Sequence, residues 1–228
     1  MKSNIKLPTQ MSEDLAEETG IHIGDGSMGF YRSGNKTHWS YTYCCHEVDD
    51  EEYSIYVKKL MKRIYNLDPI EDKKRKDNTK VLRYTRKNLV LYKKNLGLPL
   101  GKKENIKIPK WILNNKNFKI ACVRGIFDTD GSISIKKKYK AEPYYPVIKV
   151  SSKSKLLINQ IKNILKEFGI NLSMYANKRI TPRNPNIIWA IGISGAINCR
   201  KYVNIFGFSN PKHLKKYKKW KKSGGTEI

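Results

Sequence analysis

The stretch that decides the fold is GIHIGDGSM at residues 20–28, because it returns as GIFDTDGSI at residues 125–133. The two stretches align without a gap, and every residue of the second copy lies 105 positions after its counterpart. The same offset carries Ala16 onto Ala121. A repeat of this kind indicates two structural units of the same type within one chain.

Each copy of the repeat is predicted to end a short helix. Towards the N-terminus, the offset pairs Ser12 with Asn117, and both residue types are favoured as helix N-caps. Towards the C-terminus, each helix runs into Asp-Gly-Ser, where Gly26 and Gly131 provide the backbone freedom to leave the helix and begin a strand.

Downstream of the motif, both halves show the same order of patterns. An alternating stretch rich in Tyr, Ile and Val predicts a strand, an amphipathic helix follows it, and further strands precede a last helix. Gly97 and Gly207 are predicted as the C-cap glycines of these last helices. The predicted strands lie at or near residues 41–45 and 80–85 in the first half, and 144–151, 172–177 and 187–193 in the second.

The chain is therefore expected to have four segments. Residues 1–98 form an N-terminal repeat, and residues 111–222 form a C-terminal repeat that closes with a basic helix. Residues 99–110 contain Pro, Gly and Lys without apolar periodicity, which is typical of a linker. Residues 223–228 are expected to form a disordered tail.

The charge of the chain points to a polyanionic partner. It has 46 Lys plus Arg against 20 Asp plus Glu, which gives a formal net charge of +26. Self-repulsion of that size favours a nucleic acid as partner. The sequence has neither an apolar run long enough for a membrane helix nor a signal-peptide pattern. We expect no membrane partner and an intracellular protein, either cytoplasmic in a prokaryote or organellar, and not secreted.

The repeated aspartates, Asp25 and Asp130, are the candidate catalytic residues and metal ligands. Each ends a helix, where the helix dipole disfavours a carboxylate unless a cation is present. If the motif helices pack side by side, the carboxylates meet, and a hard divalent cation such as Mg²⁺ removes both penalties. Such a cation activates water for phosphodiester hydrolysis. Small residues that would allow this packing, or that are simply ordinary helix-packing positions, are Ala16, Gly20, Ala121 and Gly125.

Residues 124–131, RGIFDTDG, resemble the second motif of LAGLIDADG homing endonucleases, and residues 19–26 resemble the first. The resemblance extends over nearly the whole chain. It implies an α/β (α+β) fold with two pseudo-symmetric αββαββα halves, packed through the motif helices, and a saddle of antiparallel sheets. It also implies a monomer that recognises a long asymmetric site in double-stranded DNA and cuts both strands across the minor groove. Asp25 and Asp130 would bind Mg²⁺, with Mn²⁺ as a substitute.

The resemblance implies further site residues. A basic or amide residue is expected near the end of the second strand of each half, where Lys153 and His46 are the nearest matches. The alternatives are an exposed lysine and an ordinary strand-end histidine. Asp128 is expected to be structural, because its counterpart Ile23 cannot bind a metal. His22 is expected in a polar part of the helix interface.

DNA contacts are expected from the concave faces of the sheets and from their loops. Only every other residue of a strand faces the DNA, so an error of one residue in register would invert the choice. The candidates are Arg32, Lys36, His38, Tyr41, Arg83, Lys136, Lys138, Lys149, Lys178 and Arg183.

Two other functions remain open. A catalytically silent DNA-binding regulator of the same fold would bind DNA without cutting it, although both motif aspartates are present. An RNA maturase would bind intron RNA and assist splicing. The sequence does not separate RNA binding from DNA binding, and it names neither the target site nor the host gene.

Overall fold

The computed structural model describes residues 4–72, 78–136, 145–181 and 184–222. The N-terminal half consists of α1 (Glu13–Asp25), β1 (Gly26–Ser33), β2 (Lys36–His46), α2 (Glu51–Tyr65), β3 (Ile70–Asp72), β4 (Thr79–Tyr84) and α3 (Lys87–Asn95). The C-terminal half consists of α4 (Lys110–Leu113), α5 (Lys116–Thr129), β5 (Gly131–Lys136), β6 (Tyr145–Ser152), α6 (Lys155–Glu167), β7 (Ser173–Thr181), β8 (Asn184–Ser194), α7 (Ala196–Ile205) and α8 (Pro211–Lys222). The predicted αββαββα order is confirmed in both halves, with α4 and α8 as additions to the second.

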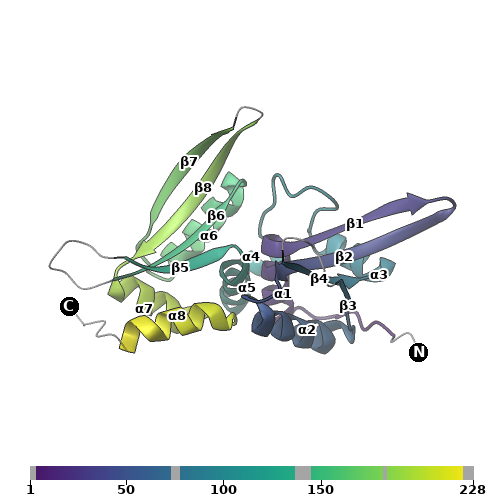
Figure 1. The fold of residues 1–228 in the computed structure, drawn as a ribbon, viewed down its shortest axis with the longest axis horizontal. Helices are drawn as coiled ribbons and strands as arrows, with labels where there is room; N and C mark the ends of the chain where they lie inside the picture. The colour runs from purple at the N-terminus through teal and green to yellow at the C-terminus, as the bar shows by residue number, and fades with distance from the viewer. Residues whose placement is uncertain (1–3, 73–77, 137–144, 182–183, 223–228) are drawn as a thin grey trace.

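Each half contains one four-stranded antiparallel sheet. The strand orders are β1-β2-β4-β3 and β5-β6-β8-β7, which correspond to each other strand by strand. The first residue after each motif aspartate pairs with the central strand of its sheet, Gly26 with Tyr43 and Gly131 with Val150. The two sheets splay apart on either side of the motif helices (Figure 1). The α+β architecture that the resemblance implies is thus confirmed.

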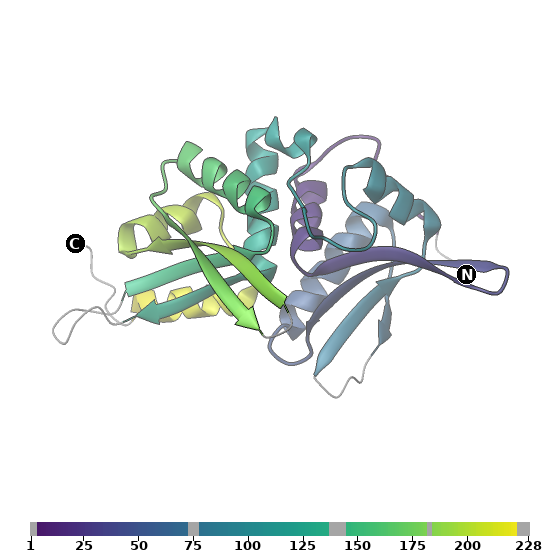
Figure 2. The same ribbon diagram turned by 90° about the horizontal axis from the view of Figure 1, so that it is seen from above.

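The motif helices α1 and α5 lie side by side at the centre of the molecule (Figure 2). Glycine makes this approach possible, because a Cβ added at Gly20 would lie 2.9 Å from the carbonyl carbon of Cys122. A Cβ at Gly125 would lie 2.8 Å from the backbone nitrogen of Ile21. Side chains cannot fit at such distances, so the two backbones are in direct contact.

The ends of the helices agree with the sequence in part. Ser12 caps α1 and accepts a hydrogen bond from the Leu15 N–H, as predicted. The prediction that Asn117 caps the second motif helix is wrong, because Asn115 is the N-cap of α5 and accepts from the Phe118 N–H. Gly97 and Gly207 follow α3 and α7 with φ of 97° and 67°, the left-handed conformation that a C-cap glycine provides.

The segment between α3 and α4 contacts both halves. The Gly101 N–H donates to the Met28 carbonyl of β1 at 2.9 Å. Further along, the Ser154 hydroxyl at the start of α6 donates to the Ile106 carbonyl at 2.7 Å, and the Ile108 N–H donates to the Gln160 side chain. This segment therefore ties the first sheet to a helix of the second half.

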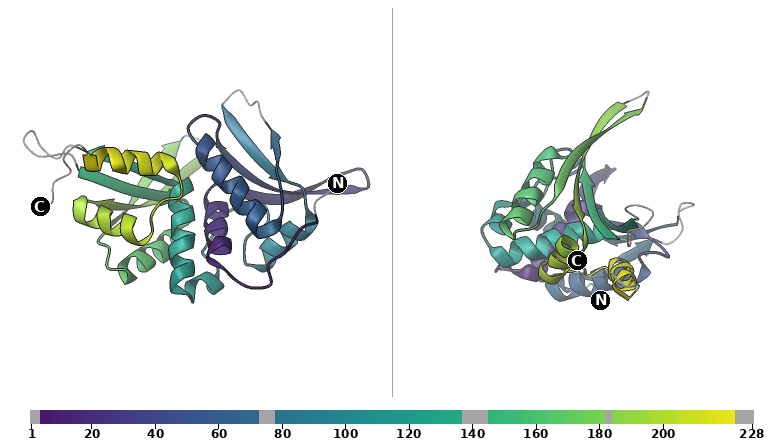
Figure 3. Two further views of the ribbon diagram at one scale, coloured as in Figure 1. Left: turned by 90° about the horizontal axis from the view of Figure 1, so that it is seen from below. Right: turned by 90° about the vertical axis from the view of Figure 1, so that its left-hand side faces the viewer.

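Helix α8 makes the reciprocal connection. It packs beside β5 and β6 of its own half and reaches α2 of the other, as the view from below shows (Figure 3). Lys212 Nζ lies 2.9 Å from an Asp50 oxygen, and Lys215 Nζ lies 2.7 Å from a Glu52 oxygen. Each half thus ends in a segment that holds the other half. No helix among the described residues is long and apolar enough to cross a membrane.

Candidate active site

Asp25 and Asp130 come together where the two motif helices end. Asp25 is the last residue of α1, and Asp130 is the C-cap of α5. A Cβ added at Gly24 would lie 3.5 Å from Cγ of Asp130, which places the second aspartate against the end of the first helix. The packing of α1 on α5 therefore brings the repeated carboxylates to one place.

The ionisation of this pair is strongly perturbed. Burial, together with the nearby Asp130 charge, raises the pKa of Asp25 to about 7. Surrounding protein atoms likewise raise the pKa of Asp130 to about 6, although this residue keeps an exposed edge, and the Lys103 charge opposes the rise. Two carboxylates that resist ionisation in each other's presence form a site that gains from a bound cation.

Lys103, which the sequence analysis did not single out, reaches the pair from the segment between α3 and α4. Its Nζ donates to the carbonyl oxygens of His22, Ile23 and Gly24, at 3.3 Å and 3.0 Å for the first two. These carbonyls lie at the C-terminal end of α1, where a cation opposes the negative end of the helix dipole, and the His22 carbonyl also accepts the Gly26 N–H. Lys103 also lowers the pKa of both aspartates. It therefore caps α1 and supplies positive charge between the carboxylates.

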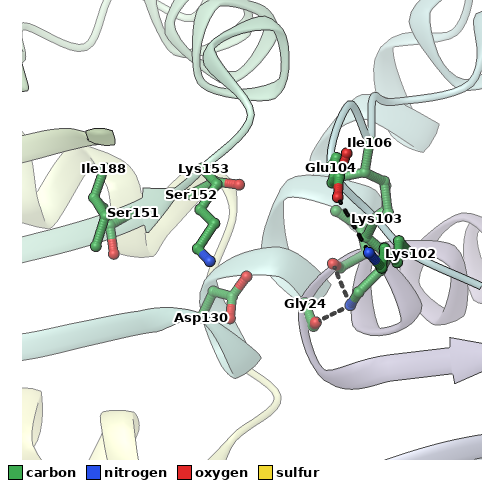
Figure 4. Close-up of a pocket in the computed structure, with 11 residues that line it drawn as sticks. Gly24, Lys102, Lys103, Glu104, Ile106, Asp130, Ser151, Ser152, Lys153 and Ile188 are labelled. Atoms are coloured by element: carbon green, nitrogen blue, oxygen red, sulfur yellow. Dashed lines mark hydrogen bonds and ion pairs between the residues drawn. The ribbon is translucent and has the colours of Figure 1, made fainter. Parts of the chain in front are cut away.

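Lys153 lies beside Asp130, as the resemblance predicted. A cavity of about 520 Å³ opens between the end of β6 and the segment that carries Lys103, and Asp130 and Lys153 both line it. The Lys153 side chain points across this cavity towards the Asp130 carboxylate (Figure 4). The space next to the pair is thus open and bounded by three lysines, Lys102, Lys103 and Lys153.

The corresponding position in the first half is arranged differently. His46 ends β2, and its Nδ1 accepts a hydrogen bond from the Asp49 N–H at 3.1 Å. The ring therefore stabilises the turn before α2. Near Asp25 the additional charges are Asp50, which raises the pKa of Asp25, and Lys212, which lowers it. The surroundings of the two aspartates are not symmetric.

Asp128 has the structural contacts expected of it. Its carboxylate is 2 % exposed and accepts hydrogen bonds from the backbone N–H groups of Ser209 and Asn210, at 2.9 Å and 3.1 Å. The Asn210 amide also donates to the Asp128 carbonyl. Asp128 thus fastens the start of α8 to the motif helix and does not join the pair.

His22 is fully buried and stacks on Tyr41, with ring centroids 5.1 Å apart. Neither ring nitrogen has a hydrogen-bond partner in the described part of the chain. The charged side chains of Lys93 and Lys103 act on the ring, so its expected role in a polar part of the helix interface stays a prediction. Burial lowers the pKa of His22 well below its usual range, so the ring is neutral.

The residues present fit a divalent cation. Asp25 and Asp130 supply carboxylate oxygens, the ligands that Mg²⁺ and Mn²⁺ prefer. Within the described ranges, no group of three or more His, Cys, Asp and Glu side chains forms a complete metal site. The rest of the coordination shell would come from water and from phosphate oxygens of a substrate.

The groove face of each sheet can be identified from burial and strand register. In the first sheet, Met28, Tyr41 and Tyr43 point into the core, so Ser27, Tyr31, His38, Ser40, Thr42 and Arg83 lie on the opposite face around a cavity of about 560 Å³. In the second sheet, Ser132, Lys149, Ser151, Tyr175 and Asn177 line a cavity of about 260 Å³ together with Asp130. The groove face of the second sheet thus leads directly to the aspartate pair.

Several predicted DNA contacts lie on the groove faces of the two sheets. His38 and Arg83 line the first cavity and Lys149 lines the second. Lys36 is exposed and lies on the same face of β2 as His38. Lys136 is exposed and lies on the same face of β5 as Ser132. Arg83 is also paired with Asp72, at 2.5 Å.

One of the predicted contacts is wrong. Tyr41 is 2 % exposed and donates a hydrogen bond to Glu18 at 2.8 Å, so it belongs to the core. Arg32 is exposed near the end of β1, where neither face of the strand is buried, so its contact with DNA stays a prediction. Lys138 and Arg183 lie outside the described residues, and the Lys178 side chain does as well.

Comparisons with known proteins agree with this geometry. Residues 117–207 match the family model of the LAGLIDADG-like domain. The chain is 27% identical over 205 residues to the replication factor C small subunit of Methanocaldococcus jannaschii, a match that covers 90% of this chain but 10% of that protein. It is 29% identical over 136 residues to the tRNA-splicing ligase RtcB of Pyrococcus abyssi, of which it covers 14%. The chain therefore spans only a small part of these two relatives.

Solved structures with a similar fold cover nearly the whole chain. A structure of mesophilic variants of the homing endonuclease I-DmoI matches with a TM-score of 0.60 at 17% identity, covering 86% of this chain and 95% of that one. The LAGLIDADG homing endonuclease I-GzeII in complex with its DNA target matches with a TM-score of 0.58 at 12% identity, covering 93% and 89%. Residues 117–207 are therefore similar to the LAGLIDADG-like domain, and the two halves together have the fold of LAGLIDADG homing endonucleases.

Proposed function

We propose that this protein is a homing endonuclease that hydrolyses both strands of double-stranded DNA at a specific asymmetric site with a divalent metal. The observation that carries the proposal is the meeting of Asp25 and Asp130 at the ends of two helices in backbone contact. Burial raises the pKa of both carboxylates, and the Asp130 charge raises that of Asp25 further, so their ionisation carries a penalty that a divalent cation relieves. Mg²⁺ is the proposed metal, and Mn²⁺ its substitute.

The similar structures support this proposal. I-DmoI has been crystallised with DNA and Mn and with DNA and Ca, and I-GzeII with its DNA target. The net charge of +26 also favours a nucleic acid, since a basic surface attracts phosphates over a long range. The names of the replication factor and the RNA ligase contribute nothing here, because the shared segment is a small fraction of each protein.

In the proposed reaction, Asp25 and Asp130 hold the metal and the groove faces of the two sheets bind the DNA. When bound, a divalent cation supplies activation of water and neutralisation of the leaving oxygen. Lys103 and Lys153 border the same space and would stabilise the negative charge that develops on the phosphate. The groove-facing residues of the two halves differ, so a monomer would read an asymmetric site.

The test is selective cleavage from a plasmid library that carries randomised inserts, incubated with Mg²⁺. We expect wild-type protein to linearise a small subset of sequences, and Asp25→Asn and Asp130→Asn each to abolish linearisation. Both variants should still bind the selected duplex in Ca²⁺. Surviving cleavage in either variant would show that these carboxylates do not carry the reaction.

Assays of binding and of splicing separate the competing functions. Specific binding of DNA without cleavage in Mg²⁺ or Mn²⁺ would indicate the regulator. Splicing assistance to an intron RNA that survives both aspartate substitutions would indicate the maturase. Light scattering of the protein with one equivalent of selected duplex should give one protein chain per DNA, as proposed for a monomer.

A further inference from the structure

Helix α8 presents a lysine-rich surface that the sheet grooves do not account for. The helix has 12 residues, seven of them lysine, and it contains no acidic residue. We propose that α8 binds the phosphate backbone of the DNA that flanks the half-site read by the second sheet. The proposal rests on the DNA-binding function proposed above and extends the bound segment beyond the sheets.

The inner face of α8 is fixed to the body of the protein. His213, Tyr217 and Trp220 are 2%, 8% and 3% exposed, and they follow one another at helical spacing. The Arg200 guanidinium of α7 lies 5.7 Å from the centre of the Trp220 ring. The start of the helix is held by the contacts of Asp128 with Ser209 and Asn210. The helix is therefore a rigid part of the structure.

The position of α8 places its first turn at the catalytic centre. Lys212 bonds Asp50 and lowers the pKa of Asp25. From there the helix packs along β5 and β6, and Figure 1 shows it running beneath β5 from α2 towards the outer end of the second half. Twelve helical residues span about 18 Å, the length of roughly five successive phosphates of one strand.

The outer face carries charge without counter-charge. Lys216, Lys218, Lys219, Lys221 and Lys222 are exposed. Among the described residues, the acidic partners of α8 are Asp50 for Lys212 and Glu52 for Lys215, both in the first two turns. Lysines three and four apart on a helix repel each other, so this face is destabilising until a polyanion binds to it.

The chemistry of this face fits phosphates better than other partners. The apolar side chains of α8 are turned inward, which leaves no apolar face for insertion into a membrane. Lysine ammonium groups on flexible stems bind phosphate as point charges and carry no base specificity. A row of them beside the cleavage site is suited to the backbone of the same duplex that the grooves hold.

The test compares two variants that lose the same number of charges. The α8 variant combines Lys218→Gln, Lys219→Gln, Lys221→Gln and Lys222→Gln. The control variant combines Lys59→Gln, Lys94→Gln, Lys110→Gln and Lys166→Gln, four exposed lysines on other helices. Binding of the selected duplex is measured in Ca²⁺ over a range of KCl concentrations. Circular dichroism and thermal melting check that both variants are folded.

We expect the α8 variant to reduce the slope of log affinity against log salt by about 2 to 4, since each lost phosphate contact removes about 0.9. The control should change it by less than about 1. Shortening the duplex beyond the second half-site should remove the difference between wild type and the α8 variant, and shortening at the other end should not.

Three results would overturn the proposal. The two variants could have equal slopes, the effect of α8 could be independent of duplex length, or the α8 variant could lose more affinity for single-stranded RNA than for the duplex. If wild-type protein binds no duplex at all, the proposed endonuclease function fails instead. The two failures are therefore distinguishable.

Discussion

Gly20 of α1 lies against Cys122 of α5 so closely that a Cβ at position 20 would be 2.9 Å from the Cys122 carbonyl carbon. Gly125 has the reciprocal relationship with Ile21 of the first helix. Both distances involve backbone atoms, which cannot move aside as the end of a flexible side chain can. The separation of the Asp25 and Asp130 carboxylates therefore depends on glycine at both positions, because a methyl group at either one would push the two helices apart.

Substitution at these glycines should unfold or separate the halves. Gly20→Ala or Gly125→Ala is expected to lower the free energy of unfolding by about 3 kcal/mol or more, because the added methyl group forces the helices apart. Urea denaturation followed by circular dichroism measures this. The matched control is Gly29→Ala on β1, where an added Cβ meets no atom within 4 Å. Equal stability of all three variants would contradict the close packing.

Neutralising one catalytic carboxylate should stabilise the metal-free protein. The pKa of Asp25 is about 7 in the folded state against 3.8 as its ordinary value. Between about pH 4 and pH 7, Asp25 ionises in the unfolded chain but resists ionisation in the folded protein. The free energy of unfolding of the wild type therefore falls as the pH rises through this range. Asp25→Asn should raise the free energy of unfolding at pH 8 by about 1–2 kcal/mol, and by much less at pH 4.

Thermal denaturation in EDTA across this pH range measures the effect. Addition of Mg²⁺ at pH 8 should stabilise the wild type more than the variant, because the cation offsets the cost of the buried Asp25 charge beside Asp130. A variant that is less stable than wild type at pH 8 would show that Asp25 is not under electrostatic stress.

Removal of Lys103 should affect both the helix end and the catalytic pair. Lys103→Met removes the lysine donor from three carbonyls of α1, of which His22 keeps the Gly26 N–H, and is expected to cost about 1–2 kcal/mol of stability. Since Lys103 lowers the pKa of both aspartates, its loss should also move the acidic limb of the pH–rate profile to higher pH. Lys102→Met is the control, because the Lys102 side chain is 90% exposed and lies 3.9 Å from Glu104. Identical pH profiles for the two variants would exclude a role of Lys103 at the pair.

The two strand-end residues should differ in their effect on cleavage. Lys153→Met removes the amine that points at Asp130 and should slow cleavage by on the order of 10²-fold, with partial rescue by Lys153→Arg. His46→Ala should change the rate less than about twofold, because the His46 ring is bonded to the Asp49 N–H. Single-turnover cleavage of duplexes labelled on either strand provides the rates. A larger loss from His46→Ala would reverse the assignment.

The sequence predicted the parts of the fold that are coded locally. The repeat identified both motif helices and both aspartates, and the glycines at 97 and 207 identified two helix ends. The N-cap of α5 was missed because the repeat was extended without a gap to Asn117. The offset of 105 residues applies to the parts of α1 and α5 that are in contact. It does not apply to their N-termini, because α5 begins two residues earlier than the offset from Ser12 predicts.

Long-range contacts account for the other errors. Tyr41 was assigned to the DNA groove, but its hydroxyl bonds Glu18, which is buried with Lys93 in the core. A strand rich in Tyr and Thr does not show which face is buried. Lys103 was overlooked because its surroundings have the composition of a linker. Its function arises from contacts with carbonyls about 80 positions earlier in the chain.

The crossed contacts of the segment between α3 and α4 determine how hybrids of this protein with its relatives could be assembled. Gly101 and Lys103 bond the first half, and Ile106 and Ile108 bond the second. A fusion joint at Glu104 would leave each set of bonds with the parent that forms it. With a joint at the end of α3, one parent would supply α1 and the other would supply the residue at position 103. The end of α1 would then meet a segment that did not evolve with it, beside Asp25 and Asp130.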